Sequence, residues 1–192
     1  KTILQLIHKT QSVDFSHYKM NTIKRRMLRR MLIHKVDTLS KYAELLAQKR
    51  EEIDLLYEDL LINVTDFFRD AQAFQFLEST ILPRLLNSKE PGETLRIWVV
   101  ACATGEEVYS LAMLLFELHN RQNHHTTFQI FASDLSAQAI NIARTGEYSL
   151  RQLTHVSPQR LQQFFTKSKD KYRITKSLRD VCVFAEHNIL SD

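Results

Sequence analysis

Apolar residues recur at spacings of three and four along the first part of the chain. This spacing matches the turn of an α-helix, which contains about 3.6 residues, and polar residues fill the positions between. The pattern therefore predicts a small all-α bundle before about residue 70. The positions that carry it are Leu4, Ile7, Ile23, Met27, Leu28, Met31, Leu32, Leu45, Leu46, Ile53, Leu56, Leu60 and Leu61.

The pattern changes after a polar stretch at residues 87–92, and we expect a domain junction between about residues 70 and 92. Residues 95–100 form a short apolar run bounded by turn residues, which is typical of a buried strand. Residues 106–118 have the length and composition of a helix, and residues 128–132 predict a second strand. Strands and helices that alternate in this way predict an α/β domain with parallel strands and right-handed crossovers.

A further helix over residues 137–144 carries a signal at each end. Ser136 precedes it and can cap the first turn with its hydroxyl. Gly146 follows it, at a place where many helices end in the left-handed conformation.

The last part of the chain predicts a small antiparallel insertion. Ser157 and Pro158 open a predicted helix through Phe165, and two short strands are expected at 172–174 and 181–184. Two parallel strands are too few for a free-standing doubly wound sheet, so we expect the α/β domain to be partial.

Composition and charge narrow the class of protein. The chain of 192 residues is 44% hydrophobic and 25% charged, as in a folded domain, and its three glycines and three prolines favour long helices. Cys102 and Cys182 form no disulfide framework, and the sequence shows neither a leader nor a long apolar run, so we expect a cytoplasmic protein without direct membrane insertion. A net charge of +4 does not require a nucleic-acid partner.

The strongest local motif covers residues 98–107, where a strand ends in small residues before the next helix begins. A dinucleotide site would need several glycines, but only Gly105 is present, and Glu106 and Glu107 would repel a pyrophosphate. A ligand with a ribose and no phosphate, such as S-adenosylmethionine, fits better. Asp134 follows the second strand, so we expect it beside the loop after the first strand, at the carboxyl edge of the sheet, where it is the natural acceptor for ribose hydroxyls. The alternative is that these three acids only favour helix N-termini.

A second motif, Asn63-Val64-Thr65-Asp66-Phe67-Phe68-Arg69-Asp70, places two phenylalanines among polar side chains. The phenylalanines can anchor the segment while Asn63, Thr65 and Arg69 face a ligand. The alternative is a helix cap at Thr65 or Asp66 that is followed by a core phenylalanine pair.

These motifs together resemble the CheR family of chemotaxis receptor methyltransferases. The resemblance rests on Asn63-x-Thr65-x-Phe67-Phe68-Arg69, on residues 103–113 with the order Ala-Thr-Gly-Glu-Glu-x-Tyr-Ser-Leu-Ala-Met, and on Phe131-Ala132-Ser133-Asp134. Residues 13–19 and the basic stretch after them resemble the N-terminal domain of multidomain hybrid members. Val108 stands where the family usually has proline, and the family's next motif lies beyond Asp192.

The resemblance implies an all-α substrate-recognition domain over residues 1–75 and a partial Rossmann-like, class I methyltransferase domain over residues 76–192, with the β insertion at about 157–187. It implies methyl transfer from S-adenosylmethionine, with S-adenosylhomocysteine as product, to glutamate side chains of chemoreceptor cytoplasmic helices. Arg69 is then the catalytic candidate. The cofactor-binding residues that the resemblance implies are Asn63, Thr65, Arg69, Glu107, Asp134, Asn188 and Ile189.

Four arginines between Ile23 and Leu32 are expected to share one helix face, opposite the apolar residues. Such a face can be a solvated surface, a nucleic-acid contact or a contact for an acidic protein. The resemblance favours the acidic receptor helices, so these arginines are the substrate-binding candidates: Arg25, Arg26, Arg29 and Arg30.

Two other functions remain open from the sequence. The first is a methyltransferase-like module of a hybrid sensory protein that binds S-adenosylmethionine or a receptor without turnover. The second is a nucleic-acid methyltransferase, which only the arginine face suggests. His124 and His125 lack a third ligand at metal-site spacing, so no metal is expected, and Trp98 is expected in the core.

Overall fold

The computed structural model describes residues 2–16, 18–61, 64–90, 92–122 and 126–189. Contacts between residues divide the chain into two compact units, Lys1–Ile62 and Asn63–Asp192. Each unit has its own buried core.

The first unit is all-α, as the spacing of apolar residues predicts. It contains α1 (Thr2–Gln11), α2 (Met20–Ile33), α3 (Leu39–Gln48) and α4 (Arg50–Leu60). Thr38 caps α3 by accepting a hydrogen bond from the Lys41 N–H at 3.3 Å. The side chains at the centre of this unit are almost completely buried: Ile7, Phe15, Ile23, Tyr42, Leu46 and Leu56.

Two of the apolar positions from which α2 was predicted do not belong to its buried stripe. Ile23, Met27 and Met31 are buried, whereas Leu28 is 55% exposed and Leu32 is 78% exposed. Successive residues turn by about 100° around a helix, so each of these leucines points well away from the residue that precedes it. Their spacing resembles that of the core positions, but they extend the apolar stripe beyond what α1, α3 and α4 cover.

The second unit begins with a helical run that the sequence pattern did not separate from the first unit. It consists of α5 (Ala71–Phe76), the π-helical turn η1 (Leu77–Ile81) and α6 (Leu82–Asn87), and Asp70 caps it by accepting from the Ala73 N–H at 3.1 Å. Residues 63–75 belong to the second unit because Phe67 and Phe68 are buried in its core. The division between units therefore lies earlier than the expected boundary at residues 75 and 76.

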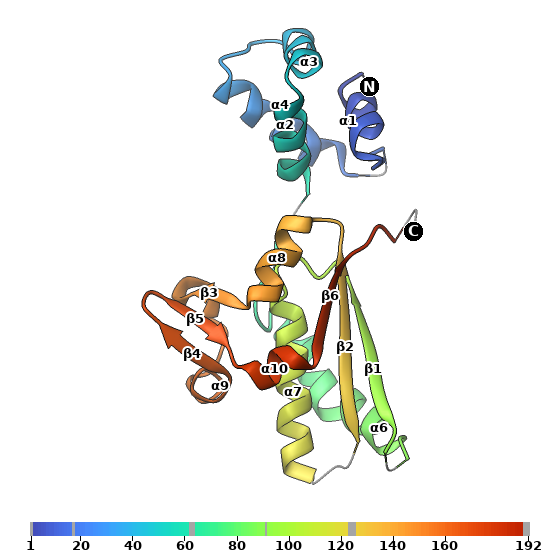
Figure 1. The fold of residues 1–192 in the computed structure, drawn as a ribbon, viewed down its shortest axis with the longest axis vertical. Coiled ribbons are helices and arrows are strands. Elements are labelled where there is room, and N and C mark those ends of the chain that lie inside the picture. The colour runs from blue at the N-terminus through green and yellow to red at the C-terminus, as the bar shows by residue number, and fades with distance from the viewer. Residues whose placement is uncertain (1, 17, 62–63, 91, 123–125, 190–192) are drawn as a thin grey trace. The chain divides into compact units, whose positions relative to one another are not determined.

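A three-stranded parallel sheet forms the centre of the second unit. Its order is β1 (Thr94–Val100), β2 (Thr127–Asp134) and β6 (Cys182–Glu186). The helices α7 (Glu106–Gln122), α8 (Ala137–Thr145) and α10 (Lys176–Asp180) lie along one side of this sheet (Figure 1). The parallel pairing of β1 with β2 confirms the predicted α/β, Rossmann-like architecture.

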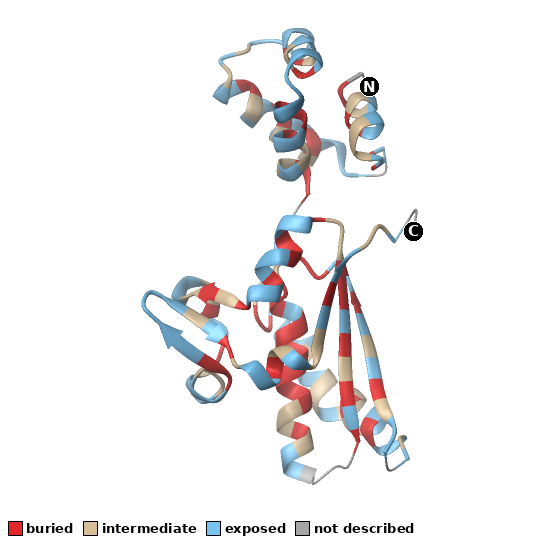
Figure 2. Cartoon of the chain, in the orientation of Figure 1, coloured by how far each residue is buried: buried red, intermediate tan, exposed pale blue. Residues whose placement is uncertain are grey.

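The two faces of this sheet differ in burial. Side chains that point toward the helices, such as Val99, Ile130 and Phe184, are buried, as the alternating colours of the strands in Figure 2 show. Side chains on the other face are more exposed, and Trp98 is 54% exposed, so its expected core position is wrong. Its indole N–H donates to the Ser133 hydroxyl at 3.0 Å. The strand pattern alone does not reveal which face the helices cover.

A second, antiparallel sheet projects from the unit. Its order is β3 (Glu147–Ser149), β5 (Lys171–Ile174) and β4 (Phe165–Ser168), and it is flanked by the short helix η2 (Leu150–Leu153) and by α9 (Pro158–Phe164). The predicted insertion is therefore present, but residues 181–184 are not part of it. This strand is β6, which pairs in parallel with β2, and α10 connects it to β5. Alternation marks a strand, but it does not specify the partner strand.

Within the described ranges, no helix is both long and apolar enough to span a membrane.

Candidate functional site

The first loop, residues 101–105 between β1 and α7, has an uncommon backbone conformation. Ala101, Ala103 and Gly105 have positive φ angles of 55°, 47° and 91°, which only glycine adopts without strain. A side chain at Gly105 would also collide with α8, because its Cβ would lie 2.9 Å from the Cβ of Ala143. Gly105 thus allows the start of α7 to approach α8, and the loop lies against the carboxyl end of β2, where the Cys102 N–H donates to the Ser133 carbonyl at 3.0 Å.

Asp134 fixes the shape of this loop. It is the last residue of β2, and its carboxylate accepts hydrogen bonds from the backbone N–H groups of Ala103 and Ser136, each at 2.8 Å. The prediction that Asp134 lies beside the first loop is confirmed. Each carboxylate oxygen has two lone pairs, so both oxygens retain acceptor capacity for a ligand hydroxyl.

The two glutamates at the start of α7 point in different directions. Glu106 is buried and Glu107 is exposed, although both belong to the first turn. The two residues are adjacent in the sequence, but the helical period separates their side chains. Glu106 lies on the same face as Tyr109, Ser110 and Met113, three or four residues apart, and all three are fully buried.

Acidic side chains surround the buried thiol of Cys102. Burial is the main cause that raises its pKa, and the negative charges of Asp134, Glu107 and Glu106 add to the rise, which brings the pKa to about 12. Asp134, at the end of β2, and Glu107, in the first turn of α7, thus both place negative charge near the loop between β1 and α7. The electrostatic potential at this edge favours a cationic or hydroxyl-bearing ligand over a phosphate. Cys102 itself is an inert buried residue, as expected.

Glu106 connects three parts of the unit. Its carboxylate accepts from the Thr104 hydroxyl at 2.6 Å and from the Gln152 amide at 3.3 Å, so it links the first loop to η2. Burial raises the pKa of Glu106, while these hydrogen bonds oppose the rise. Its backbone carbonyl accepts from the Ser110 hydroxyl at 2.7 Å. Sequence reasoning missed this role, which the buried spacing of α7 could have indicated.

The 64–70 segment lies against α7 and the insertion. Phe67 is fully buried, and its ring centroid is 4.9 Å from that of Tyr148 and 5.7 Å from that of Phe165. The Phe68 N–H donates to the Ser110 hydroxyl at 3.0 Å. The phenylalanine pair is buried, as both interpretations of this motif expected, and the residue that caps the following helix is Asp70 rather than Thr65 or Asp66.

The polar residues of this segment are less buried than its phenylalanines. Thr65 is half-buried, and Arg69 is exposed and donates through Nη1 to the Val64 carbonyl at 2.8 Å. Asp66 accepts from the Phe67 N–H at 2.9 Å and faces His155, whose Nε2 is 3.3 Å from its carboxylate. Asn63 lies outside the described residues.

The remaining cofactor candidates follow β6. The His187 N–H donates to the Asp134 backbone carbonyl at 3.0 Å, and Glu186 is the register partner of Asp134. Asn188 and Ile189 come directly after, half-buried and exposed respectively, and so lie at the same edge of the sheet as Asp134. A series of hydrogen bonds connects this edge of the sheet to the 64–70 segment. Asp134 accepts from the first loop, the first loop donates to the Glu106 carboxylate, and the Ser110 hydroxyl bridges the Glu106 carbonyl and the Phe68 N–H.

The arginines of α2, in the first unit, do not form a single exposed face. Arg25 and Arg29 are exposed, whereas the side chain of Arg30 is only 12% exposed. Arg30 donates to both carboxylate oxygens of Glu52, from Nε at 2.9 Å and from Nη2 at 2.5 Å. Arg30 lies one turn from Met27 and next to the buried stripe, so the prediction that it shares an exposed face with the others is wrong. Arg26 is half-buried.

Across the part of the chain that the structure describes, no three His, Cys, Asp or Glu side chains are grouped as metal ligands would be. His124 and His125 lie outside those residues.

Comparison with known protein families gives a match over each unit. The family described as "CheR methyltransferase, all-alpha domain" matches residues 1–61, and "CheR methyltransferase, SAM binding domain" matches residues 63–192. These matches correspond to the all-α unit and to the α/β unit described above.

Comparison with individual proteins agrees. The chain is 31% identical over 188 residues to the chemotaxis protein methyltransferase of Listeria monocytogenes. This alignment covers 98% of the chain and 70% of that protein. It is 27% identical over 197 residues to the chemotaxis protein methyltransferase of Escherichia coli, of which it covers 66%. It is also 38% identical over 190 residues to an uncharacterized 104.1 kDa protein of Rhodobacter capsulatus, of which it covers 20%. This last match supports the expected similarity to larger, multidomain proteins.

Proposed function

The chain belongs to the CheR methyltransferase family, and from this premise we propose that it transfers methyl groups from S-adenosylmethionine to glutamate side chains of chemoreceptor cytoplasmic helices. The family match supports binding of S-adenosylmethionine by residues 63–192. The names of the relatives support methylation in chemotaxis. The glutamate acceptor and the chemoreceptor substrate go beyond these matches and are proposed.

One observation carries the assignment of the cofactor site. The carboxylate of Asp134 accepts from the loop between β1 and α7, and Glu107 stands exposed in the first turn of the helix that follows the same loop. A ribose offers two hydroxyl donors and a sulfonium carries a positive charge, so both parts of S-adenosylmethionine suit an acidic edge. A dinucleotide would bring a pyrophosphate to the same place, where these acids would repel it.

We propose that Asp134 binds the ribose and that Glu107 offers an exposed carboxylate near it. Asp134 suits this role because its two oxygens are already oriented by backbone N–H groups, so little order is lost when a hydroxyl binds. Asn188 and Ile189 follow the neighbouring strand at the same edge and complete this part of the site. Thr65 belongs to the 64–70 segment that the phenylalanines anchor against α7, and Asn63, which lies outside the described residues, is assigned to the site from the sequence alone.

Arg69 is the proposed cation of the site. One of its N–H groups donates to the Val64 carbonyl, and its other N–H groups are available to a carboxylate. That carboxylate belongs either to the methionine part of the cofactor or to the incoming glutamate. In both cases Arg69 acts by positioning, since its guanidinium stays protonated and cannot act as a base.

The proposed chemistry needs no strong general base. S-adenosylmethionine, when bound, supplies an electrophilic methyl group on a cationic sulfur. The glutamate is ionised at neutral pH, so its oxygen can form the new bond to the methyl carbon while the carbon–sulfur bond breaks and its electron pair stays on sulfur. The contribution of the chain's residues is to align the two reactants and to exclude water from the carboxylate.

A two-stage experiment tests the proposal. In the whole protein, S-adenosylhomocysteine is titrated by calorimetry into the wild type and into Glu107→Gln, and weaker binding by the variant is expected. Labelled S-adenosylmethionine is then supplied with a receptor cytoplasmic domain, or with the same domain in which the glutamates are replaced by glutamine. Base-labile label on the first domain alone supports the proposal.

Absence of product binding would contradict the cofactor assignment. Binding without transfer would instead favour a methyltransferase-like module that binds the cofactor but does not turn over. Transfer of label to RNA rather than to the receptor domain would contradict the proposed substrate.

A further inference from the structure

Phe68 adopts a backbone conformation that its surroundings must maintain. Its φ angle is 49°, in the left-handed region that bulky side chains rarely occupy. Such a conformation persists only where neighbouring groups fix it. The Phe68 N–H donates to the Ser110 hydroxyl at 3.0 Å, and the ring packs edge-on against Phe74 with centroids 5.2 Å apart.

A third contact to Phe68 comes from a residue distant in sequence. The guanidinium carbon of Arg160, on α9, lies 4.4 Å from the centroid of the Phe68 ring. This is the geometry of a cation–π interaction, and it is favoured here because the ring is buried and the arginine side chain is only 20% exposed.

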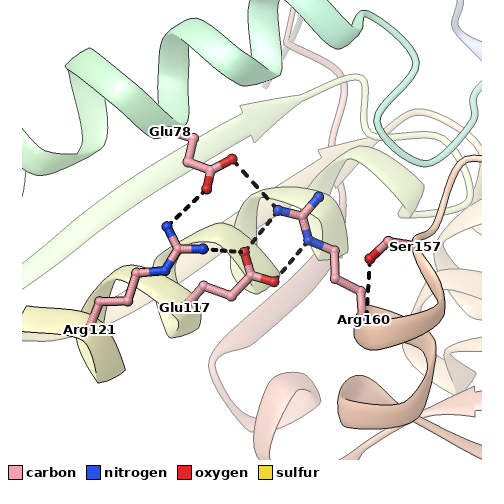
Figure 3. A network of polar contacts seen from close by, with 5 residues as sticks. All are labelled: Glu78, Glu117, Arg121, Ser157 and Arg160. Atoms are coloured by element: carbon pink, nitrogen blue, oxygen red, sulfur yellow. Dashed lines mark hydrogen bonds and ion pairs between the residues drawn. The ribbon is translucent and has the colours of Figure 1, made fainter.

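A network of charges holds Arg160 in this position (Figure 3). Its Nε and Nη2 donate to the two carboxylate oxygens of Glu117 on α7, both at 2.8 Å, and Nη2 lies 3.7 Å from Glu78 in η1. A two-point contact of this kind fixes the plane of the guanidinium. The Ser157 hydroxyl accepts from the Arg160 backbone N–H at 3.3 Å and caps the first turn of α9.

Arg121, in the last turn of α7, pairs with the same two acids as Arg160. It lies 3.2 Å from Glu78 and 4.0 Å from Glu117, and its side chain is 61% exposed. The network thus contains two arginines that share the same two acids, of which Arg160 alone, among the described residues, is found over the Phe68 ring. Comparing variants of Arg160 and Arg121 therefore distinguishes the bracing role of the network from the contact with Phe68.

From this geometry we propose that Arg160 is a positioning residue for the cofactor site, which it serves by holding the left-handed turn at Phe68. This inference rests on the proposed function, because it concerns the 64–70 segment that is assigned to the cofactor. Thr65 and Arg69 lie on either side of the Phe67–Phe68 pair, so the turn sets the direction in which the backbone carries them. The helix α9 beside the antiparallel sheet then contributes to cofactor binding through Arg160, without contacting the cofactor.

The inference is tested with Arg160→Lys and Arg121→Ala in the whole protein. Lysine keeps the positive charge beside Glu117 but lacks the planar face that lies over the ring. We expect Arg160→Lys to weaken the binding of S-adenosylhomocysteine roughly tenfold, by calorimetry, with a melting temperature close to that of the wild type. Arg121→Ala should bind S-adenosylhomocysteine as the wild type does.

A double-mutant cycle with Phe68→Leu separates positioning from general bracing. Once the ring is gone, Arg160→Lys should cause little further loss of affinity, because the two changes remove the same interaction. Additive losses would overturn the inference, and so would equal losses in Arg160→Lys and Arg121→Ala. A wild type that binds S-adenosylhomocysteine and an Arg160→Lys variant that binds it equally well would overturn the inference alone. A wild type that does not bind it would overturn the proposed function as well.

Discussion

The carboxylate of Asp134 and the backbone N–H of Ala103 lie 2.8 Å apart and join the end of β2 to the loop that follows β1. Two residues that are distant in the sequence thus determine one edge of the candidate site together. Asp134 has a structural role there before any ligand binds, and this affects how its substitution should be tested.

We expect Asp134→Asn to weaken binding of S-adenosylhomocysteine by about 1–3 kcal/mol, because a charged acceptor of ribose hydroxyls is lost. The amide oxygen can still accept one of the two backbone hydrogen bonds, which makes this variant milder than Asp134→Ala. Calorimetry measures the affinity, and a thermal melt reports any damage to the loop. Glu186→Gln is the matched control, since it removes an exposed carboxylate at the end of the neighbouring strand. Equal affinities of Asp134→Asn and the wild type would contradict the ribose assignment.

Replacement of Gly105 by alanine should destabilise the second unit more than replacement of Gly92. Both glycines have positive φ angles, 91° and 90°, so alanine is strained at each. A Cβ at Gly92 meets nothing within 4 Å, whereas at Gly105 it would lie 2.9 Å from the Cβ of Ala143. We expect about 1 kcal/mol of lost unfolding free energy at Gly92 and a larger loss at Gly105, measured by chemical denaturation. Equal losses of unfolding free energy at Gly92 and Gly105 would show that α7 and α8 can move apart at this point without destabilising the unit.

Glu52 should make the stability of the first unit sensitive to acid. It is almost fully buried, and it accepts hydrogen bonds from Arg30 and from the Tyr42 hydroxyl, at 2.7 Å, while His34 Nε2 lies 2.6 Å from it. Burial raises its pKa, but the hydrogen bonds outweigh this effect and leave the pKa below the ordinary value of 4.5. The carboxylate therefore stabilises the fold fully above the unfolded pKa, and this contribution disappears as pH falls through the lowered folded pKa.

The Glu52→Gln variant tests this account. At neutral pH it should lose about 3 kcal/mol of unfolding free energy, because Arg30 remains partly buried without its carboxylate. The difference from the wild type should shrink in acid below the unfolded pKa. Glu51→Gln, on the same helix but exposed, is the control and should behave as the wild type. A pH-independent difference for Glu52→Gln would refute the account.

The exposed arginines of α2 should contribute to receptor binding in a salt-dependent way. The double variant Arg25→Ala, Arg29→Ala is expected to bind a receptor cytoplasmic domain about tenfold more weakly at low salt, and the difference should fade as salt is added. Affinity for S-adenosylhomocysteine should not change. Lys24→Ala removes an exposed charge from another side of the same helix and should have a smaller effect. Unchanged receptor binding by the double variant would rule out these arginines. Arg30 is unsuitable for the test because it pairs with Glu52.

Local signals in the sequence predicted much of the fold. The Ser136 hydroxyl accepts from the Ala139 N–H at 3.1 Å, and Gly146 ends α8 in the left-handed conformation with φ of 62°. Both were predicted from residues next to the helix, since caps and helical periods depend on neighbours in the chain. The position of Asp134 beside the first loop was also predictable, because the carboxyl ends of parallel strands meet at one edge of a sheet.

Other features depended on contacts that local patterns do not specify. A strand pattern at residues 181–184 is compatible with either sheet, and only the packing of α10 and α8 sets β6 beside β2. Likewise, a row of arginines on one helix does not reveal that Glu52 on another helix draws Arg30 inward.

The sequence by itself therefore determined the elements, the residue types at the strand ends and the family to which they point. The tertiary structure decided which of two adjacent glutamates faces the core, that Trp98 lies on an exposed face of the sheet, and that Arg160 lies over Phe68. The physical reason is that helical periods, caps and turns are interactions between near neighbours along the chain. Burial, strand partners and charge networks depend instead on which distant surfaces meet when the chain packs.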